Sequence, residues 1–197
     1  MSKTIILSVT AGILAGYFFV PDSLVFLCEY LIKGGLCIIL FLVGLDMGRQ
    51  DNVWKEIKKV GFRVLAFPVA IIVGTLTFGA LASFLLPMTM QETIAVSAGL
   101  GWYSLAPMML AEYSPALGAT AFLSNVFREI AGIIFASLVA QKIGFIETIA
   151  APGSCAMDTC LPAVISATND RIAIYSIVSG VIVSISIPFL IQIIMSF

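Results

Sequence analysis

The chain has 197 residues, of which 60% are hydrophobic and only 11% are charged, and its mean hydropathy is +1.12. This balance lies far outside the usage of water-soluble domains and indicates a protein whose main solvent is the lipid bilayer. Ten basic and 11 acidic residues give a formal net charge of −1, and no basic stripe with interleaved aromatics indicates a nucleic-acid partner.

Hydrophobic segments long enough to cross a bilayer follow one another along the chain. A hydrocarbon core about 30 Å thick needs roughly 20 mostly apolar helical residues. About seven segments approach this length: Thr4–Val20, Leu24–Leu45, Val64–Leu86, Glu92–Ala111, Ala116–Gln141, Ile146–Ile165 and Ile172–Phe197. No small-residue cleavage site with a polar mature region follows the first segment, which is therefore interpreted as a retained helix. We expect an all-α integral membrane protein with one transmembrane transporter domain over residues 1–197.

The loops indicate an orientation. Five basic residues crowd the connection between the second and third spans, whereas the turns at 21–23 and 87–91 hold no Lys or Arg. Because cytoplasmic loops carry the excess of basic residues, this connection is predicted to be cytoplasmic. With seven spans, the N-terminus then lies inside and the C-terminus outside the cytoplasmic membrane.

The fifth predicted span contains charges near its middle. An ionisable group there costs about 2.5–3.5 kcal/mol on insertion scales, so it is usually retained for function and faces the bundle interior. Arg128 and Glu129 are such groups, and Asn125 lies one turn before Glu129. The alternative is that Arg128 and Glu129 only neutralise charges on neighbouring helices.

The fourth and sixth spans are interrupted by glycine, proline and polar residues, near 99–107 and 151–162. Unwound backbone at membrane depth is tolerated only where it is buried in protein or lines a water-filled cavity, and two such breaks form a recurrent transporter site. We therefore expect a bundle of the broken-helix type, in which Asp158 faces a cavity. Capping of a half-helix by Asp158 through Thr159 is the alternative.

Three groups of residues are similar to those of a known family. They are Gly101-Trp102-Tyr103-Ser104-Leu105, then Gly118-Ala119-Thr120-Ala121-Phe122 followed by Arg128-Glu129-Ile130, and Met157-Asp158-Thr159 with Leu161-Pro162. On these motifs the chain resembles the lysine exporters of the LysO type, which occur in bacteria and archaea and were formerly described only as a domain of unknown function.

The resemblance implies export of L-lysine and of toxic analogues such as thialysine across the cytoplasmic membrane. It also implies that two intramembrane acidic residues are essential, and these match Glu129 and Asp158. The lysine side chain is an ammonium in water, which suits opposed carboxylates, whereas its α-carboxylate suits Arg128 or a half-helix N-terminus near Ser154. The further candidates for substrate binding are Asn125, Trp102, Tyr103 and Ser104, although Trp102 and Tyr103 also suit ordinary packing.

The expected mechanism is alternating access, with lysine released outside in exchange for protons or another cation. The larger single-chain members begin with an additional hydrophobic region of about three spans. A separately encoded small membrane protein is expected to supply these spans, with Gly12 and Gly16 as a possible contact face, and a homodimer is the competing explanation.

The same residues also suit functions other than lysine export. A cation/proton antiporter on a similar fold would use the same carboxylates, and a membrane subunit of a split transporter is a further alternative. An intramembrane hydrolase lacks support, since the chain has no histidine and no HExxH motif. The four cysteines have no CxxC spacing, so Cys28, Cys37, Cys155 and Cys160 are interpreted as small buried or lipid-facing residues, and no cofactor or metal is expected.

Overall fold

The computed structural model describes residues 63–169 and 171–197, together with Ala11, Leu14, Phe18, Leu31, Gly34, Ile38 and Phe41. The predictions for the first two spans, for the face with Gly12 and Gly16, for Cys28 and Cys37, and for nearly all of the basic connection lie outside the described residues.

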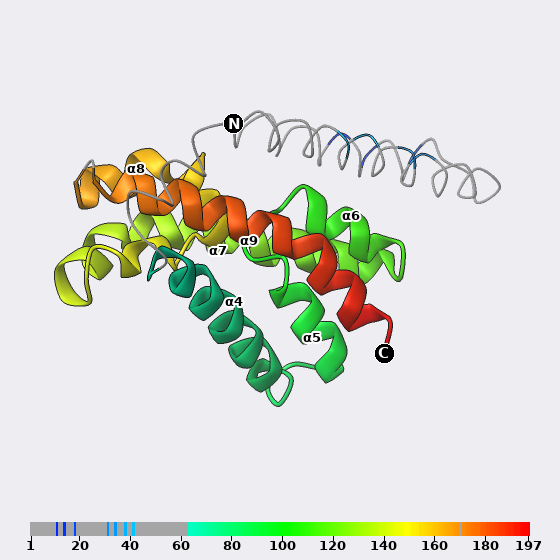
Figure 1. The fold of residues 1–197 in the computed structure, drawn as a ribbon. Coiled ribbons are helices and arrows are strands. Elements are labelled where there is room, and N and C mark those ends of the chain that lie inside the picture. Colours follow the sequence, from blue (N-terminus) through cyan, green and yellow to red (C-terminus); the bar gives the residue numbers. More distant parts are fainter. Residues whose placement is uncertain are drawn as a thin grey trace.

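The described part consists of helices joined by turns and contains no strand (Figure 1). Its elements are α4 (Arg63–Ala82), α5 (Met90–Ser97), α6 (Leu105–Ala111), α7 (Pro115–Lys142), the 3₁₀ helices η2 (Glu147–Ile149) and η3 (Gly153–Met157), α8 (Leu161–Ala167) and α9 (Ile172–Met195). Helices α4, α7 and α9 are long and apolar enough to cross a membrane. The expectation of an all-α membrane protein is therefore confirmed for this part of the chain.

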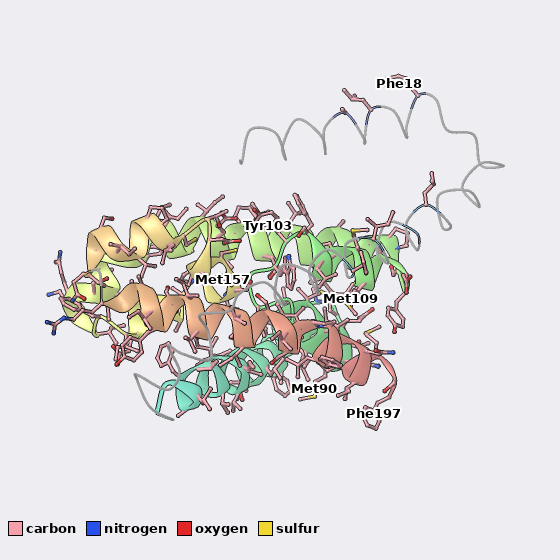
Figure 2. The ribbon with its side chains drawn as sticks, turned by 45° about the horizontal axis from the view of Figure 1, so that its top comes forward. Phe18, Met90, Tyr103, Met109, Met157 and Phe197 are labelled. Carbon is pink, nitrogen blue, oxygen red and sulfur yellow. The ribbon has the colours of Figure 1, made fainter. Side chains whose placement is uncertain are left out.

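The short elements lie between two long helices. Each of α5, α6, η2 and α8 contacts both α7 and α9, and α4 packs against α5 and α9 (Figure 1). Helix α9 also lies along η3, where Gly180 leaves room for the Met157 side chain. Figure 2 shows Met157 beside α9. The fourth and sixth predicted spans thus form an inner layer of short helices and turns.

Local chemistry accounts for the breaks in this layer. Helix α5 begins with a capping box, in which the Thr89 hydroxyl accepts from the Glu92 amide and the Glu92 carboxylate accepts from the Thr89 amide. After α5, Leu100 and Gly101 adopt φ angles of 48° and 101°, which no α-helix accommodates. Pro162 lies in the first turn of α8, where its missing N–H costs nothing.

The core and the outer surface are both apolar. The larger buried cluster joins α4, α5, α6, α7 and α9, and its members include Leu100, Leu110 and Ile187. On α7, by contrast, large hydrophobic side chains such as Phe127, Ile134 and Leu138 are exposed. Lipid is the natural environment for an apolar outer surface on helices of this length.

Candidate functional site

The two breaks meet through their backbones. The Ser154 amide donates to the Leu100 carbonyl at 2.9 Å, and the Cys155 thiol donates to the Gly101 carbonyl at 2.9 Å. A Cβ atom on Gly101 would collide with the carbonyl oxygen of Pro152, and one on Gly153 would collide with that of Leu100. We call the contact of residues 100–101 with residues 152–155 the backbone crossing. Only glycine at these two positions permits so close an approach.

Helix α7 supports the crossing through Asn125, which is 2% exposed. Its Oδ1 atom accepts from the Gly101 amide at 2.7 Å, and its Nδ2 atom donates to the Ala121 carbonyl at 2.8 Å. One turn further on from Arg128, Gly132 packs against Pro152. The amide of Asn125, a predicted substrate contact, is therefore engaged with the protein itself.

Arg128 binds the main chain just before residues 152–155 of the crossing. Its Nε atom donates to the Ala151 carbonyl at 3.0 Å, and its Nη2 atom donates to the Ala150 carbonyl at 3.1 Å and to the Thr75 hydroxyl at 3.3 Å. Ala150 and Ala151 directly follow η2, and carbonyls at the end of a helix have no donor within that helix. The guanidinium supplies the donors for these two carbonyls. None of these three acceptors carries a charge.

Glu129 lies on a different side of α7 from Arg128, because successive residues of an α-helix are rotated by about 100°. The Tyr103 hydroxyl and the Cys155 and Cys160 thiols lie within electrostatic range of the Glu129 and Asp158 carboxyl groups. The Cys160 thiol also approaches the Glu129 carbonyl, with sulfur and oxygen 3.9 Å apart. These five residues, which come from α7, from the break after α5 and from the residues before α8, form what we call the acidic cluster.

The remaining predicted residues have distinct surroundings. Asp158 is exposed, and its Oδ1 atom accepts from the Thr159 amide and, at 3.3 Å, from the Thr159 hydroxyl. Tyr103 is half-buried and Ser104 exposed, and Figure 2 labels Tyr103 at the upper side of the helices. Trp102 is partly buried and packs against the larger buried cluster.

Ser154 is buried, and its amide is engaged by Leu100. The amide at this end of η3 is therefore occupied by the protein itself. Within the part of the chain that the structure describes, no group of three His, Cys, Asp or Glu residues is arranged to hold a metal ion.

Sequence reasoning missed three residues that hold Arg128. Thr75 contacts Arg128, and the carbonyls of Ala150 and Ala151 receive its other hydrogen bonds. The only sequence signal for Thr75 is a hydroxyl inside an apolar span, which is common. The carbonyls carry no sequence signal at all.

Comparison with known proteins points to one family. The profile of the family described as "Lysine exporter LysO" matches residues 6–195. The chain is 28% identical over 157 residues to "Lysine exporter LysO" from Escherichia coli, covering 79% of this chain and 52% of the relative. It is 27% identical over 166 residues to "Putative lysine exporter" from Haemophilus influenzae, covering 82% and 83%. The chain thus spans about half the length of the Escherichia coli relative. No solved structure matches it.

Proposed function

Because the chain belongs to the lysine exporter LysO family, which is a family of transporters and not of enzymes, we propose that it exports L-lysine from the cytoplasm. Toxic lysine analogues such as thialysine share the terminal ammonium and belong to the same substrate class. The orientation proposed for this export has the N-terminus inside and the C-terminus outside the cytoplasmic membrane.

The acidic cluster is the observation that carries this proposal. Glu129 lies on α7 and Asp158 in the break before α8, yet the Cys160 thiol, two residues after Asp158, lies 3.9 Å from the Glu129 main-chain carbonyl oxygen. The side-chain ammonium of lysine has a reference pKa of about 10.4 and is charged at neutral pH. Two nearby carboxylates suit such a cation, and they also offset part of the cost of desolvating it.

The same two carboxylates provide a route for coupling. An opposite charge nearby favours the ammonium, so protonating either carboxylate weakens lysine binding. Protons that enter from outside then promote the release of lysine there, and binding of the two ligands is reciprocally linked. In this mechanism, the short elements between α7 and α9 open to one side of the membrane at a time.

The test is lysine export from cells that are fed a lysyl dipeptide. Neutral replacements, Glu129→Gln and Asp158→Asn, are expected to lower export about tenfold or more, because each removes one charge-assisted contact. Glu112→Gln changes an exposed carboxylate just after α6 and is the matched control. If both cluster variants are well expressed in the membrane and export lysine normally, the assignment is wrong.

Reconstitution of the purified chain into liposomes separates the remaining cases. Lysine-dependent transport by the chain alone supports the exporter without a second polypeptide. Transport that appears only after a small membrane protein is added supports a split transporter. Sodium–proton exchange without any response to lysine would replace the exporter by a cation antiporter.

A further inference from the structure

Gly101 connects the two elements that carry the acidic residues of the cluster. Its amide donates to Oδ1 of Asn125 at 2.7 Å, and its carbonyl accepts from the Cys155 thiol at 2.9 Å. Glu129 follows Asn125 by one turn of α7, and Asp158 follows Cys155 by three residues. Two hydrogen bonds to one glycine therefore join the helix that carries Glu129 to the segment that carries Asp158.

Cys155 extends this connection to Asp158 through its own main chain. The Cys155 carbonyl accepts from the Asp158 amide at 3.2 Å and from the Cys160 amide at 2.9 Å. Cys155 is 5% exposed, and both its thiol and its carbonyl are hydrogen-bonded. A displacement of Cys155 relative to Gly101 therefore also displaces the backbone of Asp158.

Helix α7 extends the connection to Glu129. Asn125 contacts the break after α5 one turn before Glu129, and Gly132, three residues after Glu129, packs against Pro152 of the break before α8. Residues three and four apart are neighbours on the surface of an α-helix, so Asn125, Glu129 and Gly132 lie on one side of α7. The stretch of α7 that carries Glu129 is therefore fixed against both breaks.

Two acidic side chains in one cluster need such a connection. When both are ionised, their charges repel each other, and this repulsion is stronger where water is partly excluded. Without a cation beside them, Glu129 and Asp158 push their two elements apart, whereas the hydrogen bonds of Gly101 resist the separation. A site whose groups are held in place before the ligand arrives also loses less free energy in ordering them when it binds.

We propose that Gly101 fixes the spacing of the Glu129 and Asp158 carboxylates before lysine binds, an inference that rests on the proposed function. Asn125 and Cys155 are then positioning residues, which act on the ammonium of lysine through the two carboxylates and do not touch it. Only glycine suits this connecting position, because its φ is 101° and an added Cβ atom would collide with a carbonyl of the break before α8.

Cys155→Ala tests the inference while one donor to the Gly101 carbonyl remains, the Tyr103 amide at 3.1 Å. The experiment measures the binding of radiolabelled lysine to the full chain in lipid nanodiscs. Cys155→Ala is expected to raise the Kd about three- to tenfold, which corresponds to one hydrogen bond. Cys155→Ser, whose hydroxyl donates to the same carbonyl, is expected to bind lysine within about twofold of wild type.

A double-mutant cycle separates positioning from a general loss of structure. In an Asp158→Asn background the second carboxylate is absent, so Cys155→Ala is expected to change the Kd by less than about twofold. Ser176→Ala is the matched control, because it removes a hydroxyl that donates at 2.9 Å to the carbonyl of Ala156, the neighbour of Cys155, instead of to Gly101. This variant is expected to melt at a lower temperature in detergent but to keep the wild-type Kd.

The outcomes separate this inference from the proposed function. An affinity that falls with Cys155→Ala, only while Asp158 is present, and that serine restores supports the role of Gly101. Equal binding by wild type and Cys155→Ala, or the same loss with and without Asp158, refutes that role while lysine binding stands. A serine variant as weak as the alanine variant, or an equal loss with Ser176→Ala, also refutes it. If wild-type protein binds no lysine, the proposed function fails and this inference fails with it.

Discussion

The amide nitrogen of Gly101 donates a hydrogen bond to Oδ1 of Asn125 at 2.7 Å and so ties the break after α5 to the middle of α7. Gly101 itself has a φ of 101° and faces the Pro152 carbonyl. A single side chain therefore satisfies the one amide that the turn directs toward α7. The geometry of the backbone crossing depends on this bond, because an unpaired buried amide costs free energy.

Asn125→Leu is expected to destabilise the protein by about 1–3 kcal/mol, because it leaves the buried Gly101 amide without an acceptor. The check is thermal unfolding of the purified protein in detergent, followed by tryptophan fluorescence. Thr77→Val is the control, since it removes a hydroxyl that donates to the Val73 carbonyl on an exposed surface. An Asn125→Leu variant that melts with the wild type would show that the crossing does not need this bond.

The two glycines of the crossing are expected to be intolerant of alanine. At Gly153 and Gly101 the φ angles are 65° and 101°, and an added Cβ atom would strike a backbone oxygen, which cannot move aside. Gly153→Ala and Gly101→Ala should therefore lower the yield of folded protein severalfold in size-exclusion chromatography. Gly74→Ala is the matched control, because its Cβ atom meets open space. Equal yields for all three variants would contradict the close approach.

The long helices could be predicted from hydropathy because their signal is local. The span expected at Ala116–Gln141 corresponds to α7, Pro115–Lys142, and the span expected from Ile172 begins at that residue in α9. Each is a continuous apolar run, and a bilayer requires such a run to be helical. Hydropathy also identified the interrupted regions, but it did not show that they form short helices such as α5.

The partners across the crossing could not be predicted, because they are remote in sequence and involve main-chain atoms. The sequence indicates Asn125 as a polar group in an apolar span, but it does not indicate that the Oδ1 atom accepts from an amide 24 residues away. Arg128 donates to carbonyls 22 and 23 residues away, and a carbonyl is present at every position of a chain. Residue type therefore indicated which side chains are unusual, but not what they contact.

Two buried serines of α9 are expected to respond oppositely to removal of their hydroxyl. Ser176 donates to the Ala156 carbonyl at 2.9 Å, whereas the Ser184 hydroxyl is buried and has no hydrogen-bond partner in the described part of the chain. Ser176→Ala should lower the free energy of unfolding by about 0.5–1.5 kcal/mol, and Ser184→Ala should leave it unchanged or raise it. Chemical denaturation in detergent measures both. A marked loss with Ser184→Ala would instead indicate a bound water or ion.

Water is expected to reach the acidic cluster. Cys155 and Cys160 are buried free thiols, whereas Ser104, next to Tyr103, is exposed. If the cluster faces an aqueous cavity, as the proposed function requires, a Ser104→Cys thiol should react with a charged maleimide that lipid excludes. Leu138→Cys on α7 is the matched control, because Leu138 is 53% exposed on an apolar surface that suits lipid.

The labelling is done in membranes, on a background in which Cys28 and Cys37 are replaced by serine. Ser104→Cys is expected to react several times faster than Leu138→Cys, and Cys155 and Cys160 should stay unlabelled because burial denies the reagent access. Excess lysine should slow the reaction at Ser104→Cys, since a ligand held between Glu129 and Asp158 occupies the space beside Tyr103. Equal rates at the two introduced cysteines would place Ser104 in lipid, which would leave the acidic cluster without the aqueous path that lysine needs.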